Sequence, residues 1–293
     1  MNRPIEASWL AVRRAADAAA RQHSTPLVRM LADALASSGS GPVSVVDVGA
    51  GTGANQTWLA PALREAGFAG PQDWHLLDHD ADLLQVASRS TEELPGVHST
   101  RHTARVADVA GLLPRLRRPR VITCSALLDL LTAAEVDHLV GATLESGQAA
   151  LWALSVTGTV APTPRHPGDH LVSELFNADQ QRTLDDDRAL LGPTAWSHAA
   201  DRLRAGGWEV HTVSTPWQLG PADAALLRRW VDERADAAAG ASDQPDVRSR
   251  VRSWAAARRS HLDDGVLSVR VGHTDLLALP DNVISVQTSS PSW

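Results

Sequence analysis

Residues Val45–Ala54 read VVDVGAGTGA, a β-branched apolar run followed by an acid and by three glycines at every second position. The run is apolar on both faces, which is typical of a buried parallel strand. Glycines at 49, 51 and 53 let the backbone turn sharply and approach a ligand with no Cβ in the way. A helix opening after them would aim its free N–H groups at an anionic or polar ligand. The stretch therefore predicts a strand, a ligand-binding loop and a helix.

The spacing of the glycines fits two kinds of loop. Gly49-x-Gly51-x-x-Ala54 satisfies the loose dinucleotide fingerprint, and Gly49-x-Gly51-x-Gly53 satisfies the loop of S-adenosylmethionine (SAM) enzymes. Dinucleotide folds usually carry an apolar residue where this chain has Asp47. A buried acid is costly unless it is hydrogen-bonded, here to the loop and a cationic ligand. The stretch thus resembles motif I of the class I SAM-dependent methyltransferases. That resemblance implies a doubly wound Rossmann-like α/β fold, whose seven-stranded sheet is mostly parallel with an antiparallel strand seven.

Composition predicts a globular cytoplasmic protein. The 293 residues are 43% hydrophobic and 21% charged, as expected for a soluble chain with a sizeable core. We find no apolar run near the ~20 residues of a membrane span, and no signal-peptide core. A single cysteine, Cys124, excludes an internal disulfide framework and a cysteine-based zinc cluster, and we expect it to be an inert core thiol. The twelve histidines are scattered, so we also expect no metal site.

The charged residues argue against nucleic acid as a partner. The net charge is −7, although a local basic groove is compatible with that value. The sequence has no lysine and no tyrosine. It therefore contains neither a Tyr-x-x-x-Lys dehydrogenase dyad nor the Asn-Pro-Pro-Tyr motif of amino-directed DNA methyltransferases. Residues 125–129 also lack the Pro-Pro-aromatic platform that would stack a flipped base, so with the acidic net charge we expect a small-molecule substrate.

Two helices are predicted before the glycine-rich stretch. The first has an apolar stripe made of Ile5, Trp9, Val12 and Ala16. The second follows Thr25 as N-cap and Pro26 at the first helical position. In many small-molecule methyltransferases such helices fold over the cofactor cleft. The resemblance therefore implies that residues 1–38 form a lid and that Trp9 binds the acceptor, whereas simple packing on the sheet edge is the alternative.

The resemblance also implies a cofactor site at the ends of four strands, predicted over 43–48, 74–77, 98–106 and 120–125. Asp78 stands where the family's second acid accepts both ribose hydroxyls, a feature that NAD enzymes share. Asp108 follows the third strand, where an acid of the family accepts a hydrogen bond from the adenine amino group. The backbone N–H of the next residue, here Val109, donates to a ring nitrogen in the family. The implied cofactor-binding residues are Asp47, Gly49, Ala50, Gly51, Gly53, Asp78, His79, Asp108, Val109 and Ser125. For His79, an exposed turn is the alternative.

The acceptor side is predicted after the fourth strand. Open parallel sheets bind ligands at the carboxyl ends of their strands, so residues 125–129 should border the methyl group. Thr132-x-x-Glu135 is typical of a capping box that opens a helix. A fifth strand over 149–156 leads into a long connection, 157–192, and such loops are often functional. We interpret it as an acceptor-side lid, with an exposed excursion as the alternative. The acceptor-binding candidates are Trp9, Arg165, Phe176 and Asn177.

Methyl transfer from a sulfonium is an in-line displacement, so the protein mainly aligns the reactants in a dry pocket. A base is needed only where the acceptor is not already nucleophilic at neutral pH. The sequence offers three candidates for this role: His166, His170 and Asp129. None of this chemistry requires a metal.

The last third of the chain predicts a sixth strand over 208–216, helices over 221–239 and 246–261, and a seventh strand over 266–273. In the methyltransferase sheet, strand seven inserts antiparallel between five and six. The arginine-rich helix at 246–261 favours a solvated face over a binding site. The expected organisation is an N-terminal helical lid (1–38), a SAM-binding domain (43–278) with the insertion 157–192, and an irregular tail (279–293).

Three functions are compatible with these motifs. The favoured one is methyl transfer from SAM to oxygen, nitrogen or carbon of a small molecule, with S-adenosylhomocysteine (SAH) as product, by a monomer or homodimer. An NAD(P)-linked oxidoreductase is disfavoured by Asp47 and by the missing tyrosine and lysine. A SAM-binding module without chemistry would carry the same motifs.

Overall fold

The computed structural model describes residues 7–39, 41–91, 94–116, 118 and 120–281. The strands are β1 (Val43–Val48), β2 (Gln72–Asp78), β3 (Val97–Thr103), β4 (Arg120–Ser125), β5 (Ala149–Thr163), β6 (Trp208–Ser214), β7 (Trp217–Leu219) and β8 (Ser268–Pro280). The α-helices are α1 (Ala7–Arg21), α2 (Thr25–Ser37), α3 (Ala54–Glu65), α4 (Ala81–Thr91), α5 (Val109–Leu112), α6 (Ala133–Ser146), α7 (Asp169–Gln180), α8 (Ala195–Ala205), α9 (Ala224–Gly240) and α10 (Pro245–Asp263). No helix among these residues is both long and apolar enough to cross a membrane.

The strands form one mixed sheet. Seven of the described strands follow the order β3-β2-β1-β4-β5-β8-β6, and β7 pairs with β8 outside that order. The first five pair in parallel, whereas β8 is antiparallel to both β5 and β6. This topology confirms the predicted fold class, including the antiparallel last strand between the fifth and the sixth. The short β7 is an addition that the sequence pattern did not predict.

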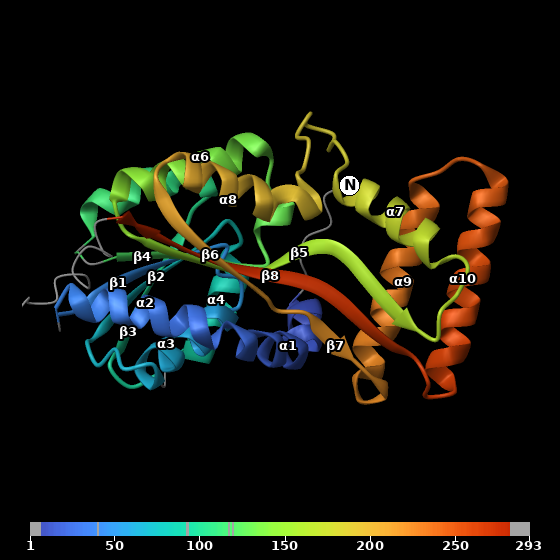
Figure 1. Cartoon of the computed structure of the whole chain (residues 1–293), viewed down its shortest axis with the longest axis horizontal. Helices are drawn as coiled ribbons and strands as arrows, with labels where there is room; N and C mark the ends of the chain where they lie inside the picture. The colour runs from blue at the N-terminus through green and yellow to red at the C-terminus, as the bar shows by residue number, and fades with distance from the viewer. Residues whose placement is uncertain (1–6, 40, 92–93, 117, 119, 282–293) are drawn as a thin grey trace, which may run out of the picture.

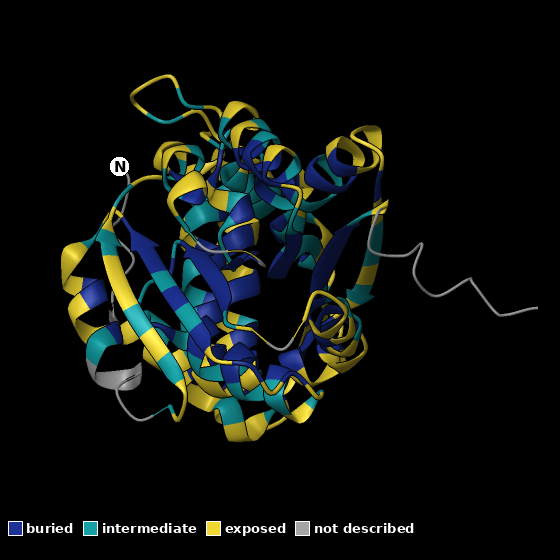
Figure 2. Ribbon diagram, turned by 90° about the vertical axis from the view of Figure 1, so that its left-hand side faces the viewer, coloured by how far each residue is buried: buried dark blue, intermediate teal, exposed yellow. Residues whose placement is uncertain are grey.

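Helices cover both faces of the sheet (Figure 1). Successive residues of a strand point to opposite faces. Val46 and Val48 of β1 therefore pack in a cluster with residues of α5, α6 and α8. Val43 and Val45 pack instead with residues of α2, α3 and α4. Figure 2 shows the buried strands between these two layers.

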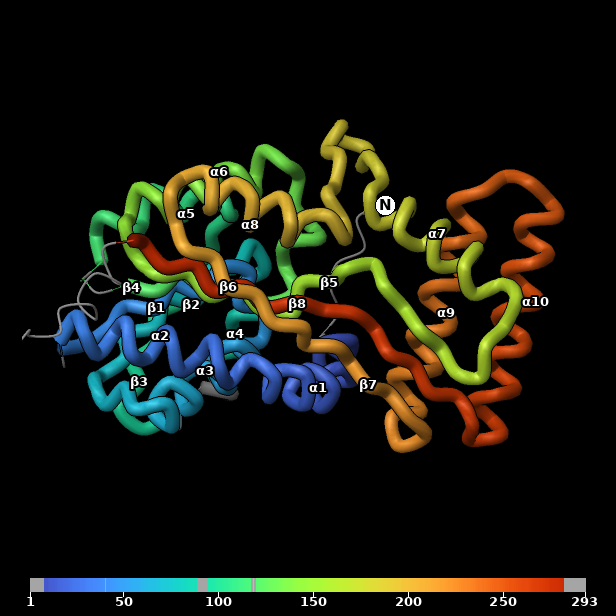
Figure 3. Tube along the Cα trace, in the orientation of Figure 1, coloured from blue at the N-terminus to red at the C-terminus, as the bar shows by residue number. Residues whose placement is uncertain are grey.

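β5 and β8 run on beyond the parallel strands into a second part of the molecule, which Figure 3 traces as two long antiparallel segments. We call this part the distal lobe; it consists of α7, α9, α10, β7 and the far ends of β5 and β8. Its own hydrophobic cluster includes Trp230 and Trp254. Ala16 and Ala20 of α1 belong to the same cluster, so α1 packs against the distal lobe as well.

The ends of β5 and β8 differ from the prediction. β5 extends to Thr163 rather than to residue 156, and β8 extends to Pro280 rather than to 273. The end of β8 therefore overlaps the start of the predicted tail, 279–293. Asp275 interrupts the apolar pattern of β8, but its buried carboxylate accepts hydrogen bonds from Ser24 Oγ, from Thr215 Oγ1 at 2.7 Å and from Leu154 N at 2.7 Å. A satisfied acid can therefore sit inside this strand. Residues 282–293 lie outside the described residues.

One predicted helix cap also differs. Thr25 is the first residue of α2 and not its N-cap, which is Ser24.

A proline inside a helix can kink or divide it, yet α3 is one helix with Pro61 inside it. Leu59 and Leu63 on either side of the proline are both buried in the core. Their packing holds the two halves of α3 together at the cost of one backbone hydrogen bond.

Candidate functional site

A cavity of about 880 Å³ opens at the carboxyl edge of the parallel strands and reaches into the distal lobe. Its first part, which we call the loop end, is lined by Gly49, Gly51, Asp78 and Ser125. Its second part, the distal end, is lined by residues of α7, β7, α9 and β8 that include Phe176, Trp217, Trp230, Arg234 and His273. Residues of α1 line the cavity along its side. One continuous space therefore joins the glycine-rich loop to the distal lobe.

The glycine-rich loop folds back onto the end of β2. Gly51 N donates to Asp78 Oδ2 at 2.8 Å, and Ala50 N donates to Leu77 O at 2.9 Å. The φ angles of Gly49, Gly51 and Gly53 are +67°, +52° and +77°, a region that disfavours other residues. A Cβ on Gly49 would lie 2.8 Å from Leu127 Cδ1. The loop therefore needs its glycines both for its turn and for its close packing.

Asp78 presents a carboxylate to the loop end of the cavity. Besides Gly51 N, it accepts a hydrogen bond from Asp80 N through Oδ1 at 2.9 Å. Each carboxylate oxygen has a further lone pair for a ligand. His79 follows it with an exposed ring whose Nδ1 lies 3.2 Å from Asp78 Oδ1. The end of β2 thus offers acceptors to a ligand that carries hydroxyl groups.

Asp47 lies beneath the loop rather than in the cavity. It is fully buried, and its Oδ1 accepts a hydrogen bond from Asn55 Nδ2 at 2.8 Å. Its Oδ2 has no hydrogen-bond partner among the described residues. Burial raises the pKa of Asp47 to about 7, although the hydrogen bond from Asn55 opposes the shift. Asn55 also donates to Thr123 Oγ1 at 3.0 Å, so Asp47 and Asn55 tie the start of α3 to β1 and β4.

α1 covers the loop end from the side. Arg21 Nη2 donates to Ser125 Oγ at 2.8 Å, and Arg21 Nη1 donates to Ala54 O at 3.2 Å. Leu10 Cδ1 is 3.5 Å from the place that a Cβ on Gly51 would take. Within the predicted lid, α1 therefore lies at the cavity, whereas α2 packs in the helix layer on the sheet. Residues 1–6 lie outside the described residues.

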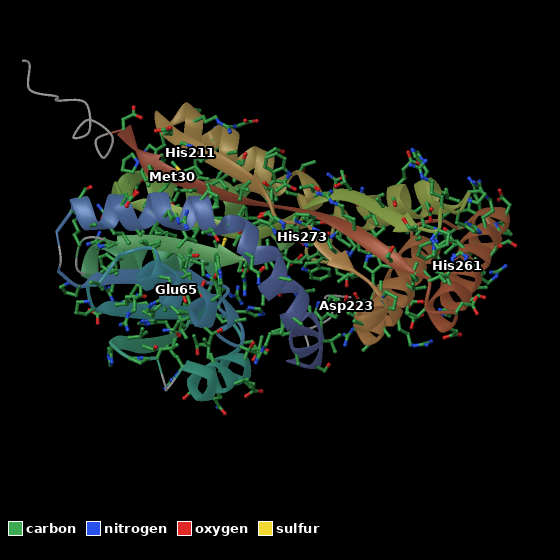
Figure 4. The ribbon with its side chains drawn as sticks, turned by 60° about the horizontal axis from the view of Figure 1, so that its bottom comes forward. Met30, Glu65, His211, Asp223, His261 and His273 are labelled. Carbon is green, nitrogen blue, oxygen red and sulfur yellow. The ribbon has the colours of Figure 1, made fainter. Side chains whose placement is uncertain are left out.

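The distal end of the cavity is rich in aromatic side chains. The guanidinium of Arg234 stacks with its Cζ 3.9 Å from the ring centroid of Phe176 and 4.7 Å from that of Trp230. The ring of His273 lies 4.9 Å from that of Trp217, and Figure 4 labels His273 on β8 between the sheet and the distal lobe. His273 Nδ1 lies 3.1 Å from Val271 O and donates to it. Burial and the nearby Arg13 lower the pKa of His273 to about 4, so the neutral ring keeps Nε2 as an acceptor.

Many of the predicted site residues line this cavity, and the others lie elsewhere. The predicted residues that line it are Trp9, Gly49, Ala50, Gly51, Asp78, His79, Ser125, Asp129, Phe176 and Asn177. Burial raises the pKa of Asp129, which is half-buried at the cavity wall. Those that do not line it are Asp47, Gly53, Asp108, Val109, Arg165, His166 and His170. Gly53 precedes α3, Asp108 is exposed and accepts a hydrogen bond from Arg105 N at 2.8 Å, and Val109 is buried in the core.

The segment with Arg165, His166 and His170 is held against α10 instead of facing the cavity. Asp169 Oδ1 accepts hydrogen bonds from Trp254 Nε1 at 2.8 Å and from Arg258 Nη2. His166 Nδ1 accepts from Gly168 N at 3.0 Å, and the exposed His170 pairs with Glu174 at 3.0 Å. The two histidines proposed as bases are thus not brought together with Asp129, which does line the cavity.

The cavity residues that sequence reasoning missed include Trp217, Trp230, Arg234 and His273. For two of them the sequence holds a signal, because α9 buries a stripe of Leu227, Trp230, Val231, Arg234 and Ala238. An arginine at an apolar position of an amphipathic helix marks a buried charge. No group of three His, Cys, Asp or Glu side chains among the described residues is placed to hold a metal ion.

Among known proteins, this chain is similar to solved structures, and the similarity is one of fold. No family model matches the sequence, and no curated protein matches it either. A solved loganic acid methyltransferase with SAH is similar at a TM-score of 0.51 and 10% identity, over 96% of this chain and 99% of that chain. The cyclopropane synthase MmaA2 from Mycobacterium tuberculosis matches at a TM-score of 0.40 and 12% identity, over 86% and 83%. The mycolic acid cyclopropane synthase CmaA1 complexed with SAH matches at 0.40 and 13%, over 87% and 85%. The chain has the Rossmann-like fold of the first of these enzymes.

Proposed function

We propose that this protein transfers a methyl group from SAM to a small molecule inside the cavity. The observation that carries the proposal is the contact between Gly51 N and Asp78 Oδ2, at the edge of the sheet where open α/β folds bind ligands. The contact brings a backbone that has no Cβ and a cavity-facing carboxylate to the same place. The similarity in fold to a methyltransferase with SAH supports the same cofactor.

The residues at the loop end fit SAM. Gly49 and Gly51 line the cavity with backbone that carries no Cβ, and Asp78 offers acceptors to two ribose hydroxyls. Ser125 at the end of β4 borders the same space. When bound, SAM supplies a methyl group on a positively charged sulfur. α1, through Leu10 and Arg21, would shield this end of the cavity from water, which favours a displacement that loses charge.

The distal end is the proposed place of the acceptor. Trp9, Phe176 and Asn177, which are three of the four predicted acceptor-binding residues, line the cavity together with Trp217 and Trp230. Pockets for small molecules are mostly apolar with a few polar groups that fix orientation. Asp129 is the predicted base that lies at the cavity, and its raised pKa suits a group that takes up a proton.

Calorimetric titration with SAM, SAH and NAD tests the cofactor. We expect binding of SAM and SAH and none of NAD. Asp78→Ala should weaken SAH binding by about 2–3 kcal/mol, the range for hydrogen bonds to a charged group. Asp80→Ala is the matched control, because Asp80 caps α4 through Asp82 N at 2.9 Å and does not line the cavity. Heat with NAD but not with SAM, or an unchanged Asp78→Ala, would overturn the proposal.

A second experiment tests the acceptor class. Methyl-labelled SAM is incubated with the protein and with separate pools of metabolites, RNA, DNA and proteins. We expect label in small molecules. Label in a macromolecular pool, or SAM binding without any labelled product, would contradict transfer to a small molecule.

A further inference from the structure

Arg234 is a buried cation with no hydrogen-bond or ion-pair partner among the residues that the structure describes. Four arginines among the described residues are buried: Arg21, Arg120, Arg234 and Arg258. Arg21, Arg120 and Arg258 each donate hydrogen bonds to oxygen atoms. Arg234 is 7% exposed, and its Nε and Nη1 are buried without a hydrogen-bond partner among the described residues. An uncompensated buried charge is costly to the free protein, and an anion would offset that cost.

The surroundings of Arg234 orient its guanidinium. Phe176 from α7 and Trp230 from α9 lie against it, at 3.9 and 4.7 Å from Cζ to the ring centroids. Stacked rings cover the faces of a guanidinium and leave its N–H edge for binding. That edge matches the two oxygens of a carboxylate or a phosphate. Arg234 lines the distal end of the cavity, so such a group can reach it from the site.

Several other charged side chains that line the cavity are already paired. Glu233 Oε1, next along the chain, accepts a hydrogen bond from Arg229 Nε at 2.9 Å. At the same cavity, Arg188 pairs with Glu135 at 2.7 Å and Arg182 pairs with Asp179 at 3.1 Å. Burial lowers the pKa of Arg234 to about 9, so the side chain is still a cation at neutral pH. The field at this point of the cavity therefore favours an anionic ligand.

We propose that Arg234 anchors an oxyanion, a carboxylate or a phosphate, carried by the methyl acceptor, whose apolar or aromatic body packs against Trp217 and Trp230. This inference rests on the proposed function, because it names the class of substrate for the same cavity. It places the anion-binding residue on α9 rather than at Arg165, which is exposed beyond the cavity. Arg234 acts in binding and orientation and takes no part in the transfer itself.

Binding of simple probes tests the anchor in the full-length protein. Benzoate and phenyl phosphate carry the two oxyanions on an aromatic body, and benzamide is the neutral counterpart of benzoate. We expect at least one oxyanion to bind at least tenfold more tightly than benzamide. A preference for benzoate indicates a carboxylate substrate and a preference for phenyl phosphate a phosphorylated one. The anchor is overturned where neither oxyanion binds, or where benzamide binds equally well.

Variants assign this binding to Arg234. Arg234→Met should weaken the oxyanion at least tenfold, and Arg234→Lys, which keeps the charge but not the fork, should weaken it by less. Arg228→Met is the matched control, because Arg228 lies on the same helix, is exposed, and pairs with Asp263 at 2.9 Å. That variant should bind within twofold of wild type. Unchanged oxyanion binding in Arg234→Met overturns the anchor.

Two further measurements separate this inference from a structural role and from the proposed function. Without ligand, Arg234→Met should melt at a higher temperature than wild type, because it removes an unpaired buried charge. A lower melting temperature together with lost SAH binding would mean that Arg234 serves the fold and would overturn the anchor. SAH binding without oxyanion binding would overturn this inference and leave the proposed cofactor standing. Oxyanion binding without SAH binding supports the anchor and overturns the proposed cofactor.

Discussion

Arg21 Nη2 donates to Ser125 Oγ over 2.8 Å, and this contact joins the last residue of α1 to the last residue of β4. Arg21 is buried and stacks its guanidinium 5.2 Å from the ring centroid of Trp58. Burial lowers its pKa from the usual value, although Asp17 opposes the shift. The first helix is thus fastened to the sheet at the edge of the cavity.

This contact predicts a coupling between Arg21 and Ser125. Arg21→Met should lower the free energy of unfolding by about 2 kcal/mol, since Ser125 Oγ loses this donor and Ala54 O keeps Thr57 Oγ1 but loses Arg21. In a double-mutant cycle with Ser125→Ala, measured by urea unfolding, the two changes should be non-additive by about 1 kcal/mol. Additive losses would mean that the hydrogen bond contributes nothing of its own.

The loop glycines predict a loss of binding that is separable from a loss of stability. Gly51→Ala places a Cβ at φ +52° at the cavity, and Gly147→Ala places one at φ +62° after α6, with no atom within 4 Å. Each should lower stability by about 1 kcal/mol through the strained backbone. Only Gly51→Ala should also weaken SAH in calorimetry. Equal SAH affinities in the two variants would place the ligand away from the loop.

Asp47 predicts a dependence of stability on pH. Its pKa rises from 3.8 to about 7 in the folded protein, so between these values the native state holds a proton that the unfolded chain releases. The contribution of Asp47 to stability therefore falls as pH rises from about 4 to about 7. Asp47→Asn removes this loss. The difference in free energy of unfolding between Asp47→Asn and wild type should therefore grow in favour of the variant by about 4 kcal/mol from pH 4 to pH 8, as measured by chemical denaturation.

His273 predicts a dependence of stability on pH that is opposite in sign to that of Asp47. The pKa of His273 falls from 6.5 to about 4 on folding, so between these values the unfolded chain binds a proton and the native state does not. Wild-type stability from this group is lost as pH falls from about 6.5 to about 4. His273→Gln should therefore gain about 3 kcal/mol relative to wild type as the pH is lowered through that window. Parallel pH profiles of wild type and the variant would show that His273 does not titrate as its burial requires.

The helix cap at Thr132 predicts a local loss. Thr132 Oγ1 accepts from Glu135 N at 3.2 Å, and Glu135 Oε2 accepts from Thr132 N at 2.9 Å. Thr132→Ala should cost about 1 kcal/mol in thermal or urea unfolding, and Thr132→Ser should retain most of that stability because it keeps the hydroxyl. A Thr132→Ser variant as unstable as Thr132→Ala would assign the effect to the lost methyl group.

Local patterns in the sequence predicted the fold well. The run Val45–Val48 with its glycines places β1 and the loop, and Thr132 with Glu135 forms the predicted capping box. Both depend on residues that are neighbours in the chain, where propensity and spacing decide the structure. The order of the sheet followed from the resemblance that these local features carry.

Contacts between distant parts of the chain account for most of what the sequence did not predict. Asp169 binds Trp254 and Arg258, 85 and 89 residues further on, and these bonds hold Arg165 and His166 against α10. Asp275 lies in β8 because Ser24, Thr215 and Leu154 satisfy it. Periodicity in one segment carries no information on such pairings. Arg234 differs, because its apolar position in α9 was visible in the sequence.

The place of β8 affects how this protein can be made. β8 is the last strand of the described chain, yet it lies between β5 and β6 and supplies one wall of the distal lobe. On the ribosome, β5 emerges long before β8, and during that interval its edge carries unpaired N–H and C=O groups. The nascent polypeptide cannot close the sheet until residues 268–280 have been added. The period of greatest risk for aggregation, and of greatest need for chaperones, is therefore the synthesis of residues 164–267.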